Sequence, residues 1–154
     1  ERQIVNQIKE QLCYCICDFE NIMREPNELS FQLPNGYVIF IGMEAFRAVE
    51  PMFKPSLIGL SDASLQKCAY NCIMKSYSEN HKELVQNILL VGGSLQFRGI
   101  AQCVKKELLS LLPNQLGKHI KVHNSDDEFL NFNGAVALAN NPYFAQNCYC
   151  AQNK

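Results

Sequence analysis

The chain has 154 residues, of which 47% are hydrophobic and 19% charged, and its formal net charge is −1 at pH 7. A domain of this length can bury about two-thirds of the surface of its unfolded chain, which is enough for a core. The balanced charge argues against a direct nucleic-acid or membrane-surface function, and no apolar run approaches the roughly 20 residues of a membrane span.

The first segment has the periodicity of an amphipathic helix. Its apolar residues recur at steps of three and four, at Ile4, Ile8, Leu12, Cys15 and Phe19. That spacing places them on one face of a helix that begins at residue 1. Because nothing precedes this helix to cap it, we expect further chain upstream.

A β-hairpin is predicted next, over residues 31–41. Phe31 and Leu33 alternate with polar residues, and a Pro-Asn-Gly turn at 34–36 separates them from a second run of strand-forming residues. The residues between the helix and the hairpin, 24–28, are polar and include a proline, which predicts a loop.

Mostly irregular structure is expected after the hairpin, followed by a helix. Two prolines keep residues 42–59 from forming long helices, although 44–49 can form a short one. Ser61 or Asp62 can then cap a helix that runs to about Lys75.

The following part of the chain predicts a βαβ unit. After a helix that starts near residue 78, the purely apolar run 88–91 suits a strand that is covered on both faces. A helix over 99–112 and an alternating strand over 119–123 complete the unit. A last short helix is predicted over 133–139.

Eight cysteines stand at positions 13, 15, 17, 68, 72, 103, 148 and 150. The N-terminal residues are too polar for a secretion signal, so we expect a cytoplasmic, cytoskeletal location, with the nucleus as a second possibility, and reduced thiols. Structural zinc sites usually space their ligands as C-x₂₋₄-C, which the C-x-C pairs do not match. The cysteines are therefore interpreted as small buried hydrophobes, and a metal site is the alternative.

Several blocks of the sequence resemble the later half of the actin family, in order and at nearly the same spacing. They lie at residues 1–14, 18–20, 33–36, 41–47, 53–56 and 92–100. The resemblance covers roughly residues 1–139 and is that of a distant relative. It implies an α+β class and part of the fold shared by actin, hexokinase and heat-shock chaperone ATPases. We expect a subdomain-4-like helix-and-hairpin lobe at 1–60, a subdomain-3-like βαβ lobe at 61–139 and a polar tail at 140–154.

The resemblance also implies a function. The chain would be a fragment of a divergent actin-like or actin-related protein, a structural or scaffolding subunit that contributes one wall of a cleft for ATP or ADP with Mg²⁺. Its partners would be other actin-like subunits or a larger protein assembly, docked at strands 88–91 and 120–122. The alternatives are a working actin-like ATPase whose N-terminal half lies outside this chain, and a cysteine-rich metal-binding module.

Five residues are implied at the nucleotide. In the family, the second glycine of a Gly-Gly loop after a strand, an aromatic residue four positions later and an adjacent Lys-Glu pair on a helix lie against the ligand. These roles fall on Gly92, Gly93 and Phe97, and on Lys9 and Glu10. A carboxylate can accept hydrogen bonds from ribose hydroxyls, and an ammonium group can lie near the base or the phosphates. From the residues alone, the glycines equally suit a tight turn and the charged pair a solvated helix face.

No catalytic residue is predicted, and the chain alone is not expected to hydrolyse ATP. The two phosphate-binding hairpins of the family are not in this sequence, and hydrolysis depends on the positioning and charge stabilisation that they supply. Where the family has a basic segment, this chain has acids at 126–128, interpreted as a Mg²⁺ site or simply as polar surface. His119 and His123 would lie about 13 Å apart on a strand, too far to share a metal.

Overall fold

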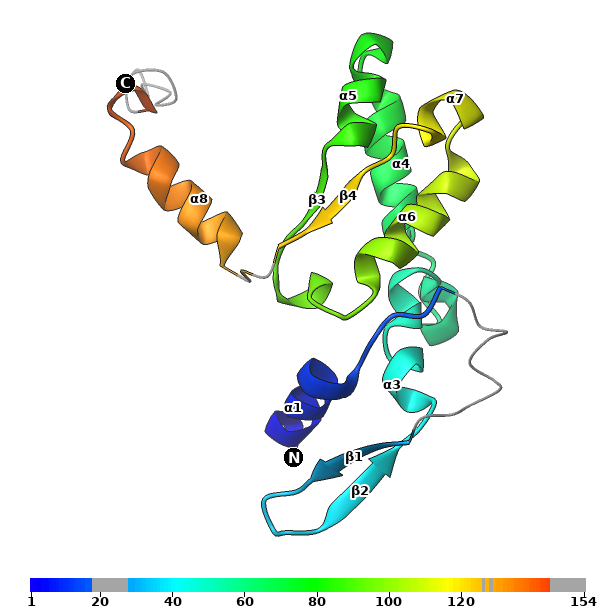
Figure 1. The fold of residues 1–154 in the computed structure, drawn as a ribbon, viewed down its shortest axis with the longest axis vertical. Helices are drawn as coiled ribbons and strands as arrows, with labels where there is room; N and C mark the ends of the chain where they lie inside the picture. Colours follow the sequence, from blue (N-terminus) through cyan, green and yellow to red (C-terminus); the bar gives the residue numbers. More distant parts are fainter. Residues whose placement is uncertain (18–27, 126, 128, 145–154) are drawn as a thin grey trace.

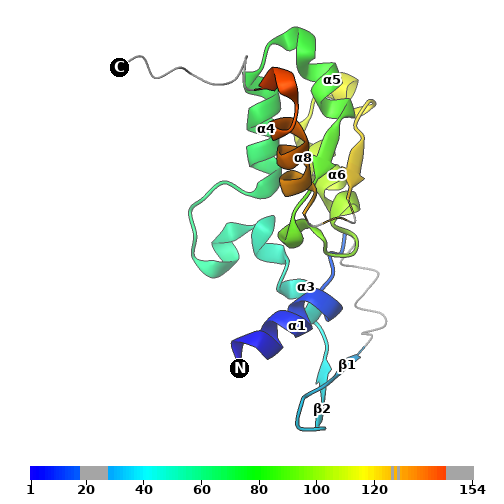
Figure 2. The ribbon, with the colours of Figure 1, turned by 90° about the vertical axis from the view of Figure 1, so that its left-hand side faces the viewer.

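The computed structural model describes residues 1–17, 28–125, 127 and 129–144. Phe19, Asp126, Glu128, Cys148 and Cys150 lie outside these residues. The described chain forms two lobes of mixed helix and strand, which agrees with the α+β class (Figures 1 and 2). We call them the hairpin lobe (α1, β1, β2 and α3) and the βαβ lobe (α4 to β4). The predicted domain boundary at residue 60 stays a prediction.

The hairpin lobe contains two helices and one antiparallel pair of strands. Its elements are α1 (Arg2–Leu12), β1 (Leu29–Gln32), β2 (Val38–Ile41) and α3 (Glu44–Arg47). The predicted turn is present, because Gly36 has a φ of 88° and the amide of Tyr37 donates to Asn35 Oδ1 at 3.2 Å. The register pairs Phe31 with Ile39, and α1 lies beside this hairpin in both views.

The prediction that the first helix continues through Cys15 is wrong. The helix ends at Leu12, and Cys13 adopts an extended conformation with ψ of 145°. The reason is tertiary, because the next amides donate to other parts of the chain. Tyr14 N bonds Ala45 O at 3.3 Å and Cys15 N bonds Arg98 O at 2.8 Å, bonds that a continuing helix could not make.

The βαβ lobe is built mainly of helices around a short sheet. Its elements are α4 (Leu65–Lys75), η3 (Ser78–Asn80), α5 (His81–Gln86), β3 (Ile88–Leu90), η4 (Gly93–Leu95), α6 (Ile100–Leu111), α7 (Asn114–Gly117) and β4 (Val122–Asn124). Two short helices, η1 (Glu50–Met52) and η2 (Pro55–Ile58), link the lobes. The predicted helix cap at Ser61 or Asp62 is wrong, because Ser64 is the N-cap residue of α4.

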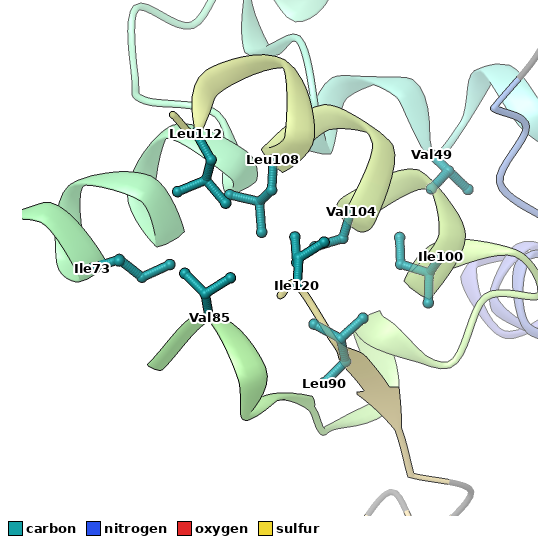
Figure 3. Close-up of a cluster of buried hydrophobic side chains, with 9 residues drawn as sticks. All are labelled: Val49, Ile73, Val85, Leu90, Ile100, Val104, Leu108, Leu112 and Ile120. Carbon is teal, nitrogen blue, oxygen red and sulfur yellow. The ribbon is translucent and has the colours of Figure 1, made fainter. Parts of the chain in front are cut away.

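The core of the βαβ lobe is one cluster of buried aliphatic side chains (Figure 3). Its members are Val49, Ile73, Val85, Leu90, Ile100, Val104, Leu108, Leu112 and Ile120. Complete burial of such a side chain contributes about 1.5–3 kcal/mol, so this cluster is the main source of stability here. Val49, which precedes the expected lobe boundary, packs in it and joins the linking segment to the βαβ lobe.

The predicted βαβ unit is confirmed, with a shift at its second strand. β3 and β4 are parallel, and Ile88 pairs with Val122. The expected strand over 119–123 begins later, because the turn of α7 persists and His119 N still bonds Leu116 O at 2.9 Å. His119 therefore does not lie on the strand, and Ile120 enters the core before the strand starts.

The last predicted helix is confirmed as α8 (Leu130–Ala139), three residues longer at its start than expected. It projects away from both lobes (Figure 1). Its apolar side chains are exposed on all sides, with Phe132 67% and Leu138 52% accessible. A helix that is apolar all round normally lies in a protein interior, so α8 presents surface suited to a partner.

The lobes meet where residues 13–17 run between α3 and the start of α6. The Tyr14 ring contacts Phe46 edge-on, with centroids 6.3 Å apart, and the Arg98 guanidinium lies 5.1 Å from the Tyr14 centroid. Gly99 has a φ of 85°, and a Cβ there would lie 2.5 Å from Cys15 O. Glycine is therefore required at position 99 for both backbone conformation and close approach.

Replacing Gly99 with alanine tests this junction. Gly59→Ala is the matched control, since Gly59 has a similar left-handed conformation (φ 74°) with nothing near its would-be Cβ. We expect Gly59→Ala to lower the free energy of unfolding by about 1 kcal/mol. Gly99→Ala should cost at least about 1 kcal/mol more, because its Cβ also meets backbone. Urea unfolding measures both losses. Equal losses of unfolding free energy in the two variants would contradict the close approach of Gly99 to the Cys15 carbonyl.

Candidate functional site

Four of the five residues implied at the nucleotide line a single cavity. Lys9 and Glu10 come from α1, and Gly93 and Phe97 from the loop that follows β3, together with Ser94 and Gln96. The cavity has a volume of about 320 Å³. Residues more than 80 positions apart in sequence are thus brought together. Gly92 is not among the residues that line it.

Local structure explains how each group reaches the cavity. Lys9 and Glu10 lie in the last turn of α1. The helix is followed by residues 13–17, which we call the junction segment because the two lobes meet there. Gly92 has φ 95° and ψ 155°, a conformation that is essentially restricted to glycine. Its carbonyl accepts the amide of Leu95 at 2.9 Å, which closes the turn into η4. Gly92 therefore shapes the loop that carries Gly93 and Phe97.

The groups in this cavity are suited to binding. The Glu10 carboxylate is an acceptor for hydroxyl groups, the Lys9 ammonium is a donor for phosphate or ring nitrogen, and the half-buried Phe97 ring offers an apolar face. A backbone at Gly93 without a side chain permits close approach of a ligand. This set can bind a small ligand that combines polar groups with an apolar face.

Asp127, the described acid of the 126–128 segment, follows Ser125 by two residues and has a structural role. Gln96, which lines the cavity, donates from Nε2 to Ser125 O at 2.7 Å. Asp127 Oδ1 accepts the amide of Phe129 at 2.9 Å, and its Oδ2 accepts Asn133 Nδ2 at 2.9 Å. Asp127 thus starts α8 rather than pointing its oxygens at an open metal position.

A second cavity, of about 310 Å³, is lined by residues 15–17, by residues between Phe46 and Leu57, and by α6. Cys15, Cys17 and Cys103 line it, together with Lys106 and Glu107 among others. Cys17 Sγ lies 2.7 Å from Cys103 Sγ, and Cys103 also hydrogen bonds Cys15. Burial, with the neighbouring Cys15 thiol, raises the pKa of Cys103 to about 12. Burial likewise raises the pKa of Cys15.

Sequence reasoning missed this thiol cluster because it placed Cys15 on a helix. The available signal was the C-x-C spacing itself. Residues two apart point to the same side only on an extended chain, so the spacing suits a strand that directs both thiols at one neighbour. The interpretation of Cys103 as a small buried hydrophobe is confirmed in part, since its side chain is 4% exposed. Cys68 and Cys72, in contrast, are exposed.

Within the ranges that the structure describes, no three His, Cys, Asp or Glu side chains are arranged to hold a metal ion. The cysteine metal-site alternative therefore gains no support from that part of the chain. Among the helices of the same ranges, none combines the length and the apolar character needed to cross a bilayer.

Comparison with known families gives one result. The family model for actin matches residues 1–153 of the chain. This match extends beyond the blocks recognised in the sequence and confirms the resemblance that they indicated.

Asp127 can be tested as the residue that starts α8. We expect Asp127→Ala to remove two hydrogen bonds and to destabilise the first turn of α8 by about 1 kcal/mol. Because α8 does not pack on either lobe, amide exchange at residues 129–133 should show the loss while global unfolding changes little. Asp127→Asn keeps an acceptor oxygen and should retain most of the protection. Equal exchange in both variants and the parent chain would contradict this role.

Proposed function

This chain belongs to the actin family, and we propose that it is a structural or scaffolding unit of a divergent actin-like protein that contributes one wall of a nucleotide cleft. The main observation in support is a shared cavity. Lys9 and Glu10 of α1 line it together with Gly93 and Phe97 of the loop after β3. Two separate segments converge there with the donors and acceptors that a nucleoside requires.

The residues fit part of an ATP or ADP molecule. A volume of about 320 Å³ is at the lower end of ligand pockets, which run from about 300 to 1,000 Å³. Glu10 would hold the ribose, Lys9 the base or the phosphates, and Phe97 the apolar face of the ligand. Bound Mg²⁺ would supply charge neutralisation for the phosphates.

Affinity for a polyanion should be low on this wall alone. Among the described residues that line it, Lys9 is the one cation, and Glu10 offsets that charge. Ser125 accepts a hydrogen bond from Gln96, and Asp127, two residues later, adds a further negative charge. Carboxylates near the phosphates oppose binding by like-charge repulsion.

The scaffolding part of the proposal rests on exposed apolar surface. β3 and β4 pair with each other, and among the described residues no further strand extends their sheet. Leu89 on β3 is 54% exposed, and α8 is apolar all round. Unpaired strand edges with apolar side chains favour pairing with another chain. We propose that another actin-like subunit or a larger assembly docks along residues 88–91 and 120–122.

Titration with Mg²⁺-ATP tests the nucleotide wall. We expect amide NMR signals of Glu10, Gly93 and Phe97 to shift, with a dissociation constant in the millimolar range. Lys9→Ala should weaken binding about fivefold, because it removes an ammonium group that lines the cavity. Lys82→Ala, which removes an exposed lysine of α5 away from the cavity, is the matched control and should leave binding unchanged.

The outcomes of this titration are distinct. Shifts confined to other residues, or an equal loss in Lys9→Ala and Lys82→Ala, would contradict the site. A micromolar or tighter dissociation constant, about −8 kcal/mol, would contradict the view that this wall is incomplete.

Sedimentation velocity tests the docking surface. We expect the chain to self-associate with rising concentration, through the exposed side of β3. Leu89→Lys should reduce association, since a charge on this strand opposes edge pairing. Tyr77→Lys is the control, because Tyr77 is also exposed but lies before α5. A monomer at high concentration with fully protected β3 and β4 amides would show that the chain closes its own core.

A further inference from the structure

Three thiols meet at the junction of the two lobes, in a cavity that the nucleotide proposal does not use. Cys15 and Cys17 lie on the extended segment after α1, and Cys103 lies on the buried side of α6. Cys17 Sγ and Cys103 Sγ are 2.7 Å apart, although the residues are separated by 86 positions in the chain.

The spacing of these sulfurs distinguishes two kinds of chemistry. Two thiolates on one tetrahedral zinc ion lie about 3.8 Å apart, given Zn–S bonds of about 2.3 Å. Sulfurs at 2.7 Å are too close to share such an ion. A disulfide bond of about 2.05 Å requires them to approach by about 0.65 Å, which small side-chain rotations can supply. The pair is therefore arranged for a covalent S–S bond.

We propose that Cys17 and Cys103 form a modification site at which a peroxide reversibly converts the two thiols into a disulfide. The cavity of about 310 Å³ gives a small oxidant access to the half-buried Cys17 side chain. Lys106 donates from Nζ to the Cys17 carbonyl at 2.5 Å and so holds a positive charge in the same cavity. The Cys17 sulfur is the nucleophile toward the peroxide, because this cavity opens onto its side chain.

The order of events follows from burial. Cys103 is nearly inaccessible and stays protonated, because its pKa is raised to about 12, so Cys17 reacts first and Cys103 second. The Cys17 sulfur attacks one oxygen of hydrogen peroxide and breaks the O–O bond. The departing hydroxide takes the thiol proton and leaves as water, so that Cys17 becomes a sulfenic acid.

The second step forms the disulfide. The Cys103 sulfur attacks the Cys17 sulfur, the S–OH bond breaks, and the hydroxyl group leaves as a second water with the Cys103 proton. Two electrons have then passed from the two sulfurs to the peroxide. A dithiol reductant reverses the reaction by thiol–disulfide exchange.

The disulfide between Cys17 and Cys103 would fix the junction segment to α6. Before oxidation, backbone hydrogen bonds such as Cys15 N to Arg98 O hold this segment. A cross-link between residues 86 positions apart removes much conformational entropy from the unfolded chain. We expect oxidation to raise Tm by about 5–15 °C.

The experiment compares the full chain before and after treatment with hydrogen peroxide. Mass spectrometry of tryptic peptides should show Cys17 linked to Cys103, and Tm should rise and return after dithiothreitol. Cys17→Ser should lose both effects. Cys15→Ser should keep them, which assigns the bond to Cys17 rather than to its neighbour. Cys68→Ser, at an exposed cysteine of α4, is the control for general thiol oxidation and should also keep them.

Three results would overturn the proposal. One is sulfinic acid at Cys17 with no cross-link, another is a cross-link to a different cysteine, and the third is an equal Tm rise in Cys17→Ser. Cys17→Ser replaces a half-buried side chain, so its circular dichroism and Tm in the reduced state establish that it folds before oxidation is compared.

Discussion

The passage of residues 13–17 between α3 and the start of α6 is the contact on which the rest of the molecule depends. Backbone bonds from Tyr14 to Ala45 and from Cys15 to Arg98 hold it on both sides. The Tyr14 ring adds contacts with Phe46 and with the Arg98 guanidinium. Because α1 precedes this segment directly, the same bonds bring Lys9 and Glu10 to the loop after β3. They also bring Cys17 to Cys103, so the same hydrogen bonds position residues that line both cavities.

Much of the fold was predictable because its periodic elements are locally consistent. The hairpin follows from a Pro-Asn-Gly turn between strand-forming residues, and α6 from Ile100, Val104 and Leu108 on one face. The apolar run at 88–91 was predicted as a strand next to a helical crossover, and it forms β3 over Ile88–Leu90. The expectation that this strand is covered on both faces is wrong among the described residues, since Leu89 is 54% exposed. In each case the local pattern and the tertiary packing favour the same structure, which is the condition under which sequence patterns are reliable.

The failures occur where tertiary bonds override local periodicity. The helical spacing of Leu12 and Cys15 predicted that the first helix continues past Leu12. The helix ends there instead, because the amides of Tyr14 and Cys15 donate hydrogen bonds to other elements. Ile120 has the alternation of a strand residue, yet the turn of α7 holds it in the core ahead of β4. The nucleotide-side residues were found only through family resemblance, since a Lys-Glu pair and a Gly-Gly pair carry little information alone. The thiol cluster needed the correct conformation at Cys15 before its C-x-C spacing had meaning.

The segment after β4 connects the proposed ligand wall to the exposed helix. Ser125 accepts a bond from Gln96, which lines the nucleotide cavity, and Asp127 two residues later starts α8. The amide of Asp127 also donates to Ser125 Oγ at 3.1 Å. Hydrogen bonds therefore run from a residue that lines the cavity, through Ser125 and Asp127, to the start of α8.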